Sequence, residues 1–265
     1  MRIPDTEQKS LTAGALKLEI YQSRQAAAEA AARVAAESLR SVVRRHSPVG
    51  VIFATGASQL ETLRALTTMS NIPWDQVIGF HMDEYLGIGP EHPASFRRYL
   101  REHLTGRVRL REFHEIDGTT SDPERTCSEY GDRLRSQRPQ LCLLGIGENG
   151  HLAFNDPAEA NFWDSLDAKV VSLDQACRQQ QVAEGWFQNL QEVPPQALTL
   201  TIPVLMRVPK LIISVPGGRK AKIVSRTLTE AISTDCPATI LRTHPNATVY
   251  LDEESAAQLD GSAFL

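Results

Sequence analysis

The sequence predicts an α/β fold with an open, mostly parallel sheet and helices on both of its faces. Short apolar runs that carry β-branched residues recur along the chain, and such runs are typical of buried strands. Helical stretches lie between most of these runs, and strands that alternate with helices form parallel β-α-β units. Because no repeat or linker divides the 265 residues, we expect one domain over residues 1–265.

The first element that we expect is one long helix from about Lys17 to His46. Alanine is frequent in this segment, and leucine and valine recur in it at spacings of three and four residues. The pattern stops just before Pro48, and a proline is a common stop signal for a helix.

Strands and helices alternate in the rest of the chain. Strands are expected over residues 49–54, 77–82, 141–146, 169–173, 198–202 and 210–215. Helices are expected over residues 58–69, 95–104, about 122–137 and 219–230. Asp122 and Pro123 suit the N-cap and the first position of the third helix. Ligands of open α/β sheets bind at the carboxyl ends of the strands, so the strand-to-helix junctions are the candidate sites.

The composition narrows the class of partner to a small molecule. The chain has 28 basic and 32 acidic side chains, a net charge of −4 and no block rich in lysine or arginine, which disfavours nucleic acid and anionic membranes. No apolar run approaches the ~20 residues that span a bilayer, and the first residues lack the apolar stretch of a signal peptide, so we expect a cytoplasmic protein. The four cysteines are scattered without a C-x-x-C spacing, as is typical of buried or incidental thiols.

The junction after the first of these strands has the residues of a phosphate-binding turn. Gly56 permits a tight turn, while Thr55 and Ser58 offer hydroxyl groups beside the free N–H groups of a new helix. An ordinary glycine turn in which Ser58 caps the helix explains the same residues. Both interpretations stay open at this point.

Two carboxylates, Asp83 and Glu84, follow a strand that is otherwise apolar. A carboxylate that projects into a cleft there can act as a general base. Because adjacent side chains point in different directions, we expect only one of the two to reach a substrate. A solvated loop or a helix cap is the alternative, and a metal site that includes His81 is disfavoured because no further ligands have the right spacing.

Residues 145–150 match the spacing G-x-G-x-x-G after a strand, which is the dinucleotide-binding fingerprint. That motif requires a long helix immediately afterwards, whereas Asn155, Asp156 and Pro157 interrupt a helix within two turns. The segment therefore predicts a glycine-rich loop that presents His151, with Asp156 five residues later. Such a histidine can shuttle a proton, and a carboxylate on its second nitrogen fixes its tautomer. A structural histidine is the alternative.

A strand, a glycine turn and a helix meet again at residues 216–221. Arg219 and Lys220 lie at the N-terminus of this helix, where the helix dipole disfavours cations by about 0.3–1 kcal/mol. An anion bound at this end explains their placement, and a solvated surface pair is the alternative.

Together these motifs resemble the glucosamine-6-phosphate deaminase/isomerase family, within the group that also contains the 6-phosphogluconolactonases. The resemblance covers most of the chain and is consistent with a Rossmann-like sheet. It rests on T-G-x-S at 55–58, F-x-M-D-E-Y at 80–85, G-x-G-x-N-G-H-x-A-F-N-D-P at 145–157 and G-x-x-K-A at 217–221. The pair M-D-E-Y and F-N-D-P is typical of the deaminases rather than the lactonases.

The resemblance implies an enzyme that converts glucosamine 6-phosphate and water to fructose 6-phosphate and ammonia by acid–base catalysis. Asp83 would move a proton between C2 and C1 of the opened sugar. His151, oriented by Asp156, would open the ring, and Asn149 belongs to the same catalytic set. The residues implied to hold the 6-phosphate are Thr55, Gly56, Ser58, Arg178 and Lys220.

The same resemblance places the reaction in carbohydrate and amino sugar metabolism, in the catabolism of N-acetylglucosamine, and classes the enzyme as a hydrolase. Proton transfer and loss of ammonia need neither a metal nor a nicotinamide cofactor, so we expect no cofactor. The expected partner is a phosphosugar substrate, not nucleic acid or membrane. Members of the family range from monomers to hexamers, so a homo-oligomer is compatible with the sequence.

Three departures from the family pattern stand out. Asn149 occupies a position where some members have aspartate, and Asp156 is one methylene shorter than the commoner glutamate. Residues 158–168 lack the serine- and arginine-rich pattern of allosterically activated members, so activation by N-acetylglucosamine 6-phosphate is not expected.

Two rival functions follow from the same residues. A 6-phosphogluconolactonase-like hydrolase would not need Asp83, because lactone hydrolysis deprotonates no carbon. A non-catalytic phosphosugar sensor would normally carry a DNA-binding domain, and the first 50 residues contain no basic recognition helix. The spacing of the motifs does not distinguish amino sugar epimers, whose hydroxyl orientation is read by loop geometry.

Overall fold

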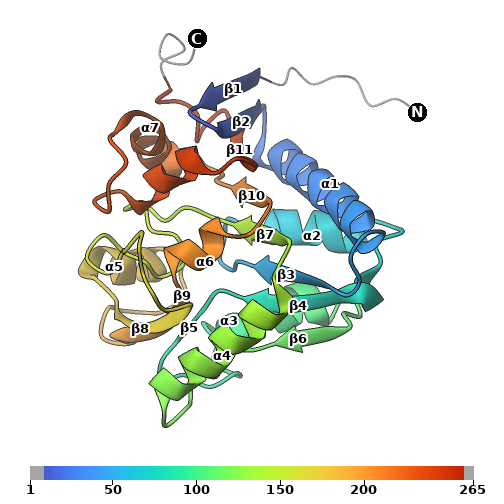
Figure 1. Ribbon diagram of the computed structural model, residues 1–265. Helices are drawn as coiled ribbons and strands as arrows, with labels where there is room; N and C mark the ends of the chain where they lie inside the picture. The colour runs from blue at the N-terminus through green and yellow to red at the C-terminus, as the bar shows by residue number, and fades with distance from the viewer. Residues whose placement is uncertain (1–8, 260–265) are drawn as a thin grey trace.

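The computed structural model describes residues 9–259, and its centre is a twisted eight-stranded sheet (Figure 1). In spatial order its strands are β1 (Lys9–Ala13), β2 (Leu16–Tyr21), β11 (Ala247–Asp252), β10 (Leu211–Ser214), β7 (Leu141–Leu144), β3 (Val49–Phe53), β4 (Val77–His81) and β6 (Glu112–His114). Neighbouring strands are parallel except for the β1–β2 hairpin. The predicted open, mostly parallel sheet is confirmed.

Helices cover both faces of this sheet, as the alternating pattern predicts. On β3, Val51 and Phe53 pack into a cluster with α1 (Arg24–Val43) and α2 (Leu60–Thr68), whereas Ile52 joins the opposite cluster. That opposite cluster includes residues of α4 (Pro123–Gln137), α6 (Ile202–Met206) and α7 (Ala221–Thr229). Because side chains of a strand alternate between faces, an entirely apolar strand is needed to bury both sides of the sheet.

The start of the chain differs from the expected single helix. Residues 16–21 form strand β2, in which Leu16 and Leu18 are fully buried and alternate with more exposed neighbours. The helix begins only after Ser23, whose hydroxyl accepts a hydrogen bond from the N–H of Ala26. The prediction of a helix from Lys17 was therefore wrong, because the alternation that pairs β2 with β11 precedes the alanine-rich stretch.

A second, antiparallel sheet contains β5 (Asp83–Tyr85), β9 (Gln196–Leu200) and β8 (Ala168–Ser172) in that order. The predicted strands at 169–173 and 198–202 exist, but they belong to this sheet rather than to the parallel series. Helix α5 (Gln175–Ala183) packs beside it, around an aromatic cluster that includes Tyr85, Phe96 and Phe154. The second sheet thus places α5 and the strand that carries Asp83 beside the carboxyl edge of the main sheet.

The remaining elements are short. Helix α3 (Phe96–Leu100) continues as a π-helical turn, η2 (Arg101–Thr105), so the helix expected over 95–104 is present but not regular. The 3₁₀ helices are η1 (Trp74–Gln76), η3 (Gly218–Lys220) and η4 (Pro237–Thr243). Between residues 9 and 259, helices that are both long and apolar enough to cross a membrane are absent.

The order of the strands creates a switch point between β3 and β7. From β3 the chain proceeds outward to β4 and β6, and it then returns to β7 and proceeds the other way to β10 and β11. The connections that follow β3 and β7 therefore diverge at the carboxyl edge of the sheet. Open α/β sheets bind their ligands in the crevice that such a reversal leaves.

Candidate active site

A cavity of about 320 Å³ lies at this switch point, and all four predicted junctions contribute to it. The sequence-predicted residues that line it are Thr55, Gly56, Ser58, Asp83, His151 and Lys220. Asp156 lies behind His151, and Asn149 lies behind Asp156. The topology thus brings together groups that are up to 165 positions apart in the sequence, counted from residue 55 to residue 220.

Asp83 is a buried carboxylate at the start of β5, and it lines the cavity. Within the described part of the chain its Oδ1 atom has no hydrogen-bond partner. Burial, and secondarily the neighbouring charge of Glu84, raises the pKa of the Asp83 carboxyl well above its usual range. An unpartnered carboxylate with a raised pKa is a strong base once ionised, which suits it to take a proton from carbon.

Glu84 points away from the cavity and caps helix α3. Its carboxylate accepts hydrogen bonds from the Ser95 hydroxyl, at 2.8 Å, and from the backbone N–H groups of Phe96 and Arg97, at 3.2 and 3.0 Å. An anion at a helix N-terminus is stabilised by these free N–H groups. The expectation that only one of the two adjacent acids faces a ligand cavity agrees with this geometry, and the helix-cap alternative applies to Glu84.

His81 stays outside the cavity. Its Nε2 atom accepts a hydrogen bond of 2.7 Å from the backbone N–H of Ile116, and burial lowers the pKa of the imidazole to about 3. A neutral, buried ring of this kind supports the backbone before Asp83 rather than exchanging protons.

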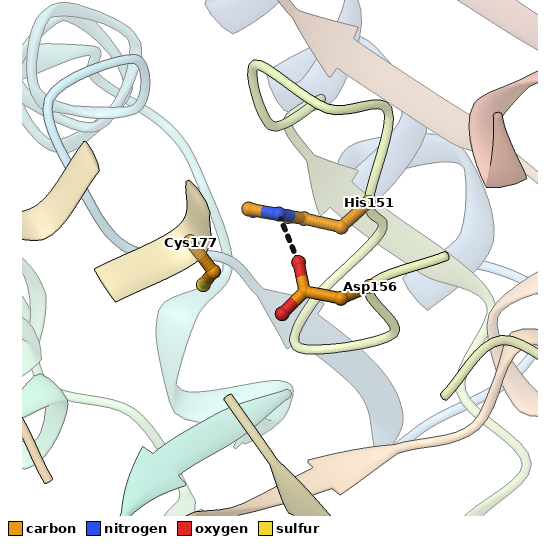
Figure 2. A group of neighbouring side chains, drawn as sticks. All are labelled: His151, Asp156 and Cys177. Carbon is orange, nitrogen blue, oxygen red and sulfur yellow. Dashed lines mark ion pairs between the residues drawn. The ribbon is translucent and has the colours of Figure 1, made fainter. Parts of the chain in front are cut away.

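His151 lines the cavity, and a carboxylate lies directly behind it (Figure 2). The Nδ1 atom of His151 lies 2.8 Å from Oδ1 of Asp156, which is fully buried. Burial acts to raise the pKa of Asp156, but contacts with His151 and Asn149 outweigh it and lower that pKa overall. An ionised Asp156 keeps a proton on Nδ1 and leaves Nε2 free to exchange a proton with a ligand.

Asn149 holds this pair from the other side. Its Nδ2 donates to Oδ1 of Asp156 at 2.9 Å, and its Oδ1 accepts from the backbone N–H of His151 at 3.1 Å. Asn149 does not line the cavity formed by the described residues. We therefore describe it as a residue that positions His151 and Asp156, which refines its predicted place in the catalytic set.

The segment that carries His151 is a loop, not the start of a helix. Residues 145–156 form turns, and the N–H of Gly147 donates to the carbonyl of His151. A Cβ atom at Gly147 would lie 2.2 Å from the His151 ring, so a glycine is required there for the imidazole to fold back over the loop. Because a loop rather than a long helix follows residues 145–150, the geometry agrees with the sequence argument against a dinucleotide-binding fingerprint.

Cys177, on α5, brings a third potential metal ligand to His151 and Asp156 (Figure 2). The candidate ligand atoms of the three residues lie within 4.8 Å of one another. Burial, with the nearby charge of Asp156, raises the pKa of the Cys177 thiol, which disfavours the thiolate that binds metals. Oδ1 of Asp156 is also engaged by both His151 and Asn149, so the arrangement favours orientation of the imidazole over coordination of a cation.

The loop after β3 also lines the cavity. Gly56 has φ = 88°, a left-handed conformation that glycine adopts without strain, and its carbonyl accepts a hydrogen bond from the Tyr99 hydroxyl. Helix α2 begins at Leu60, and the Ser58 hydroxyl caps none of its N–H groups within the described residues. The alternative in which Ser58 is a helix cap is therefore not observed, because Ser58 instead lines the cavity.

Lys220 and Arg219 face the cavity from the start of α7. The Nζ atom of Lys220 donates to the carbonyl of Ile146 at 2.9 Å, which places the ammonium group beside the glycine-rich loop. Burial lowers the pKa of Lys220, although the charges of Glu184 and Glu148 oppose this effect. A buried ammonium group that retains its charge is a binding site for an anion.

Arg178 does not join the other predicted phosphate residues. Its guanidinium donates to the carbonyls of Leu190 and Val193, at 2.6 and 3.1 Å, and the cavity of the described chain is lined without it. Arg178 and Gln181 are three positions apart on α5 and lie on nearly the same face, but the Arg178 side chain turns to the segment 190–193 whereas Gln181 lines the cavity. The structure thus contradicts the placement of Arg178 at a phosphate.

Five polar cavity residues escaped the sequence analysis: Arg24, Gln180, Gln181, Glu184 and Glu254. Gln181 is buried, and its Oε1 accepts a hydrogen bond of 2.7 Å from the Tyr85 hydroxyl. No motif marks Gln181, and the helical period of α5 does not separate it from Arg178, because residues three positions apart lie on nearly the same face. Arg24 begins α1, which no motif links to the other junctions.

All four cysteines are buried and free of disulfides, which agrees with the expectation of structural thiols.

Comparison with known proteins shows which family this chain resembles. The family model described as glucosamine-6-phosphate isomerases/6-phosphogluconolactonase matches residues 22–250. A protein of Exiguobacterium sibiricum, named glucosamine-6-phosphate deaminase, is 34% identical over 240 residues, which cover 89% of this chain and 92% of the relative. A protein of the same name from Listeria monocytogenes is 32% identical over 206 residues, covering 78% of this chain and 86% of the relative.

Solved structures show the same architecture. A monomeric glucosamine-6-phosphate deaminase superposes with a TM-score of 0.84 and 27% identity, and covers 91% of this chain and 99% of its own. A 6-phosphogluconolactonase from Trypanosoma brucei has a TM-score of 0.76 and 19% identity, with 92% and 98% covered, so this likeness shows the fold alone.

One sequence expectation is overturned by these comparisons. The enzyme class of hydrolase was wrong, because the curated relatives are named deaminases.

Proposed function

The chain belongs to the glucosamine-6-phosphate isomerase/6-phosphogluconolactonase family, and we propose that it is a glucosamine-6-phosphate deaminase. It converts glucosamine 6-phosphate and water to fructose 6-phosphate and ammonia. The observation that carries this proposal is the buried, unpartnered Asp83 carboxylate, which shares a cavity with the His151–Asp156 pair. A relative with the same name, 34% identical over most of both chains, supports it.

The phosphate group of the substrate binds at the end of the cavity formed by Thr55, Gly56, Ser58 and Lys220. The hydroxyl groups and the turn supply hydrogen-bond donors, and Lys220 supplies a positive charge. Arg219 and Arg24 add positive charge at the rim of the cavity. They supply the arginine charge that the resemblance implied for Arg178. Binding energy at this end orients the sugar and leaves the reacting carbons toward Asp83 and His151.

His151 opens the pyranose ring. In the tautomer fixed by Asp156, its Nε2 removes the proton of the anomeric hydroxyl group, and the resulting imidazolium donates a proton to the ring oxygen as the C1–O bond breaks. Asn149 takes part by holding both members of the pair. The product is the open-chain sugar, with an aldehyde at C1 and an amine at C2.

Asp83 then transfers a proton from C2 to C1. As a carboxylate it removes the proton at C2 from the sugar in its ammonium form, whose nitrogen gives a proton to O1, and this leaves a neutral enolamine. It then returns the proton to C1, so that a C2 iminium with a hydroxyl group on C1 forms. Water adds to that iminium and ammonia leaves, which gives fructose 6-phosphate. Burial of Asp83 supports this role, because a carboxylate with a raised pKa accepts a proton from carbon more readily.

We also propose that residues 1–265 form one domain, located in the cytoplasm, and that one chain is sufficient for activity. In support, the main sheet contains strands from both ends of the described chain. The monomeric state of one solved deaminase is compatible with this proposal, and association into a homo-oligomer is compatible with it too.

An assay with two substrates tests the proposal. The purified protein is incubated with glucosamine 6-phosphate and, separately, with 6-phosphogluconolactone, and ammonia, fructose 6-phosphate and 6-phosphogluconate are measured. We expect ammonia and fructose 6-phosphate from the first substrate and no enzymatic acceleration with the second. Acceleration of lactone hydrolysis alone, unchanged in Asp83→Asn, would support the lactonase alternative instead.

A further inference from the structure

Gln59 is fully buried next to Ser58, and its side chain connects the cavity loop to strand β7. The Nε2 atom of Gln59 donates to the carbonyl of Leu144 at 3.0 Å and also lies 3.1 Å from Oγ of Ser58. Among residues 9–259, the Oε1 atom of the same side chain has no hydrogen-bond partner. Gln59 is thus a buried amide of which only the nitrogen is used.

The contact with Leu144 fixes which way this amide lies. A backbone carbonyl can only accept, so the atom that faces it must be the nitrogen. The second N–H group of that nitrogen then points to Ser58, and the Ser58 oxygen must accept it. A hydroxyl oxygen that accepts in this way keeps its own hydrogen free to donate elsewhere, and Ser58 lines the cavity.

The packing at the end of β7 leaves room for this contact only because residue 145 is a glycine. A Cβ atom at Gly145 would lie 2.9 Å from Ser58 Oγ and 3.2 Å from Gln59 Nε2. Both distances are too short for ordinary packing, so the first glycine of the glycine-rich loop accommodates Gln59 and Ser58. The loop after β3 and the loop after β7 are therefore joined through one amide.

The unused oxygen is the second unusual feature. A buried acceptor without a partner destabilises a protein, and folded chains satisfy nearly all such groups. An apolar side chain of similar length would fill the same volume without this oxygen. A stability penalty at a residue that contacts a ligand-binding hydroxyl indicates a functional reason for the amide.

We propose that Gln59 positions Ser58 so that its hydroxyl donates to the phosphate dianion of the substrate. Gln59 itself does not touch the substrate. Because Gln59 donates to Ser58 Oγ, the Ser58 hydroxyl cannot donate its hydrogen toward Gln59. The rotamer in which Ser58 would present only oxygen lone pairs to the phosphate is therefore excluded. This inference rests on the proposed function for the identity of the substrate, and on the contacts of Gln59 for the mechanism.

The variant Gln59→Met tests the proposal, since methionine has a similar length and cannot donate. We expect KM for glucosamine 6-phosphate to rise about fivefold to tenfold, while kcat changes less than about twofold, because the phosphate lies away from the reacting carbons. Gln59→Leu serves as a second variant, and circular dichroism with thermal unfolding shows that each variant is folded. Gln137→Met, on α4 and outside the cavity, is the matched control and should leave both constants unchanged.

A double-mutant cycle separates positioning from a general structural effect. If Gln59 acts through the Ser58 hydroxyl, the variant Ser58→Ala raises KM by itself, and Gln59→Met adds nothing in its presence. Effects that multiply in the double variant would overturn the proposal, as would a KM for folded Gln59→Met equal to that of the wild type.

Calorimetric titration with glucosamine 6-phosphate keeps this test independent of turnover. Weaker binding by Gln59→Met, with no further loss in the double variant relative to Ser58→Ala, supports the positioning role even if no fructose 6-phosphate is formed. Equal affinities of Gln59→Met and wild type would contradict that role, whether or not the protein proves to be a deaminase.

Discussion

Asp83 and Glu84 are adjacent in the sequence but meet opposite environments, because successive residues of β5 face opposite sides. Asp83 lies in the cavity with an unpartnered oxygen, and Glu84 accepts hydrogen bonds from the first turn of α3. Sequence alone could predict that one of the two faces a ligand. It could not predict which, since that depends on the pairing of β5 with β9.

The raised pKa of Asp83 gives a prediction about stability. The folded state binds the proton more tightly than the unfolded chain, so the contribution of Asp83 to stability decreases as pH rises from about 4 through the folded-state pKa. Asp83→Asn carries no charge to desolvate, and it should therefore be more stable than wild type at neutral pH by about 1–3 kcal/mol. Urea unfolding at pH 4 and pH 7.5 measures this: the difference should grow with pH, and a variant less stable at pH 7.5 would contradict the assigned pKa direction.

The same pKa direction predicts the pH dependence of catalysis. Only the ionised Asp83 can take the proton from C2, so kcat/KM should rise with pH as the free protein loses this proton. The acid limb of the profile should lie above the ordinary range of an aspartate. A profile that is flat from pH 4.5 upward would show that no buried carboxyl must ionise.

Asp156 acts on catalysis through His151. In Asp156→Asn an amide replaces the carboxylate that lies 2.8 Å from Nδ1, so the imidazole loses both its fixed tautomer and the stabilisation of its protonated form. We expect kcat to fall roughly 100-fold or more, with a small change in KM. The exposed Asp75→Asn is the control, and an Asp156→Asn variant with a kcat within threefold of wild type would exclude this role.

At the scale of elements, Glu84 connects two segments that no local pattern relates. Burial raises the pKa of Glu84, but replacement by glutamine takes one acceptor oxygen from the Ser95 hydroxyl and the N–H groups of Phe96 and Arg97, and it removes the carboxylate paired with the buried Arg97 guanidinium. We expect Glu84→Gln to lower the free energy of unfolding by about 2–4 kcal/mol. The contrast with Asp83→Asn is the informative control: two neighbouring carboxylates should give opposite changes in the urea midpoint, and changes of the same sign would contradict the account.

The loop after β7 gives a prediction with a matched control glycine. A methyl group at Gly147 would overlap the His151 ring, whereas one at Gly89 would meet no atom of the described residues within 4 Å. Gly147→Ala should therefore displace the imidazole and reduce kcat by at least about tenfold, while Gly89→Ala keeps activity. Steady-state kinetics of both variants check this. Equal activities would show that the loop backbone shifts to accommodate the methyl group without displacing His151.

The elements also show where sequence patterns fall short. The predicted helix from Lys17 failed because Leu16, Leu18 and the alanines that follow are all apolar, so the change from a two-residue to a helical period is hidden. Arg178 was misplaced for a different reason. A local match identifies a segment, but it does not show that the Arg178 side chain bonds to the carbonyls of Leu190 and Val193 instead of lining the cavity.

At the scale of the whole molecule, the alternation of strands and helices predicted the central strands β3, β4, β7 and β10 and the edge at which the ligand cavity lies, but not β1, β2, β6 and β11. The second sheet could not be predicted, because β5 pairs antiparallel with β9 across 116 positions of sequence, from Asp83 to Thr199. This sheet is what directs Asp83 and α5 toward the cavity. The motifs predicted the class of reaction, and the nonlocal pairing of strands determines which side chains line the cavity.

The charge distribution is likewise a property of the whole molecule. The net charge of −4 is nearly neutral, yet the cavity is lined by the cations Lys220, Arg219 and Arg24 and by the acids Asp83, Glu184 and Glu254. A substrate that carries both a phosphate and an ionisable amine fits a cavity lined by both signs of charge.

The most direct test of the account measures products and binding together for wild type and Asp83→Asn. Wild type should convert glucosamine 6-phosphate to ammonia and fructose 6-phosphate in equal amounts. Folded Asp83→Asn should bind glucosamine 6-phosphate in a calorimetric titration with an affinity within about tenfold of wild type, and form neither product at a measurable rate. Retained turnover by Asp83→Asn, or the absence of both products with wild type, would contradict the central claim that Asp83 moves the proton in this cavity.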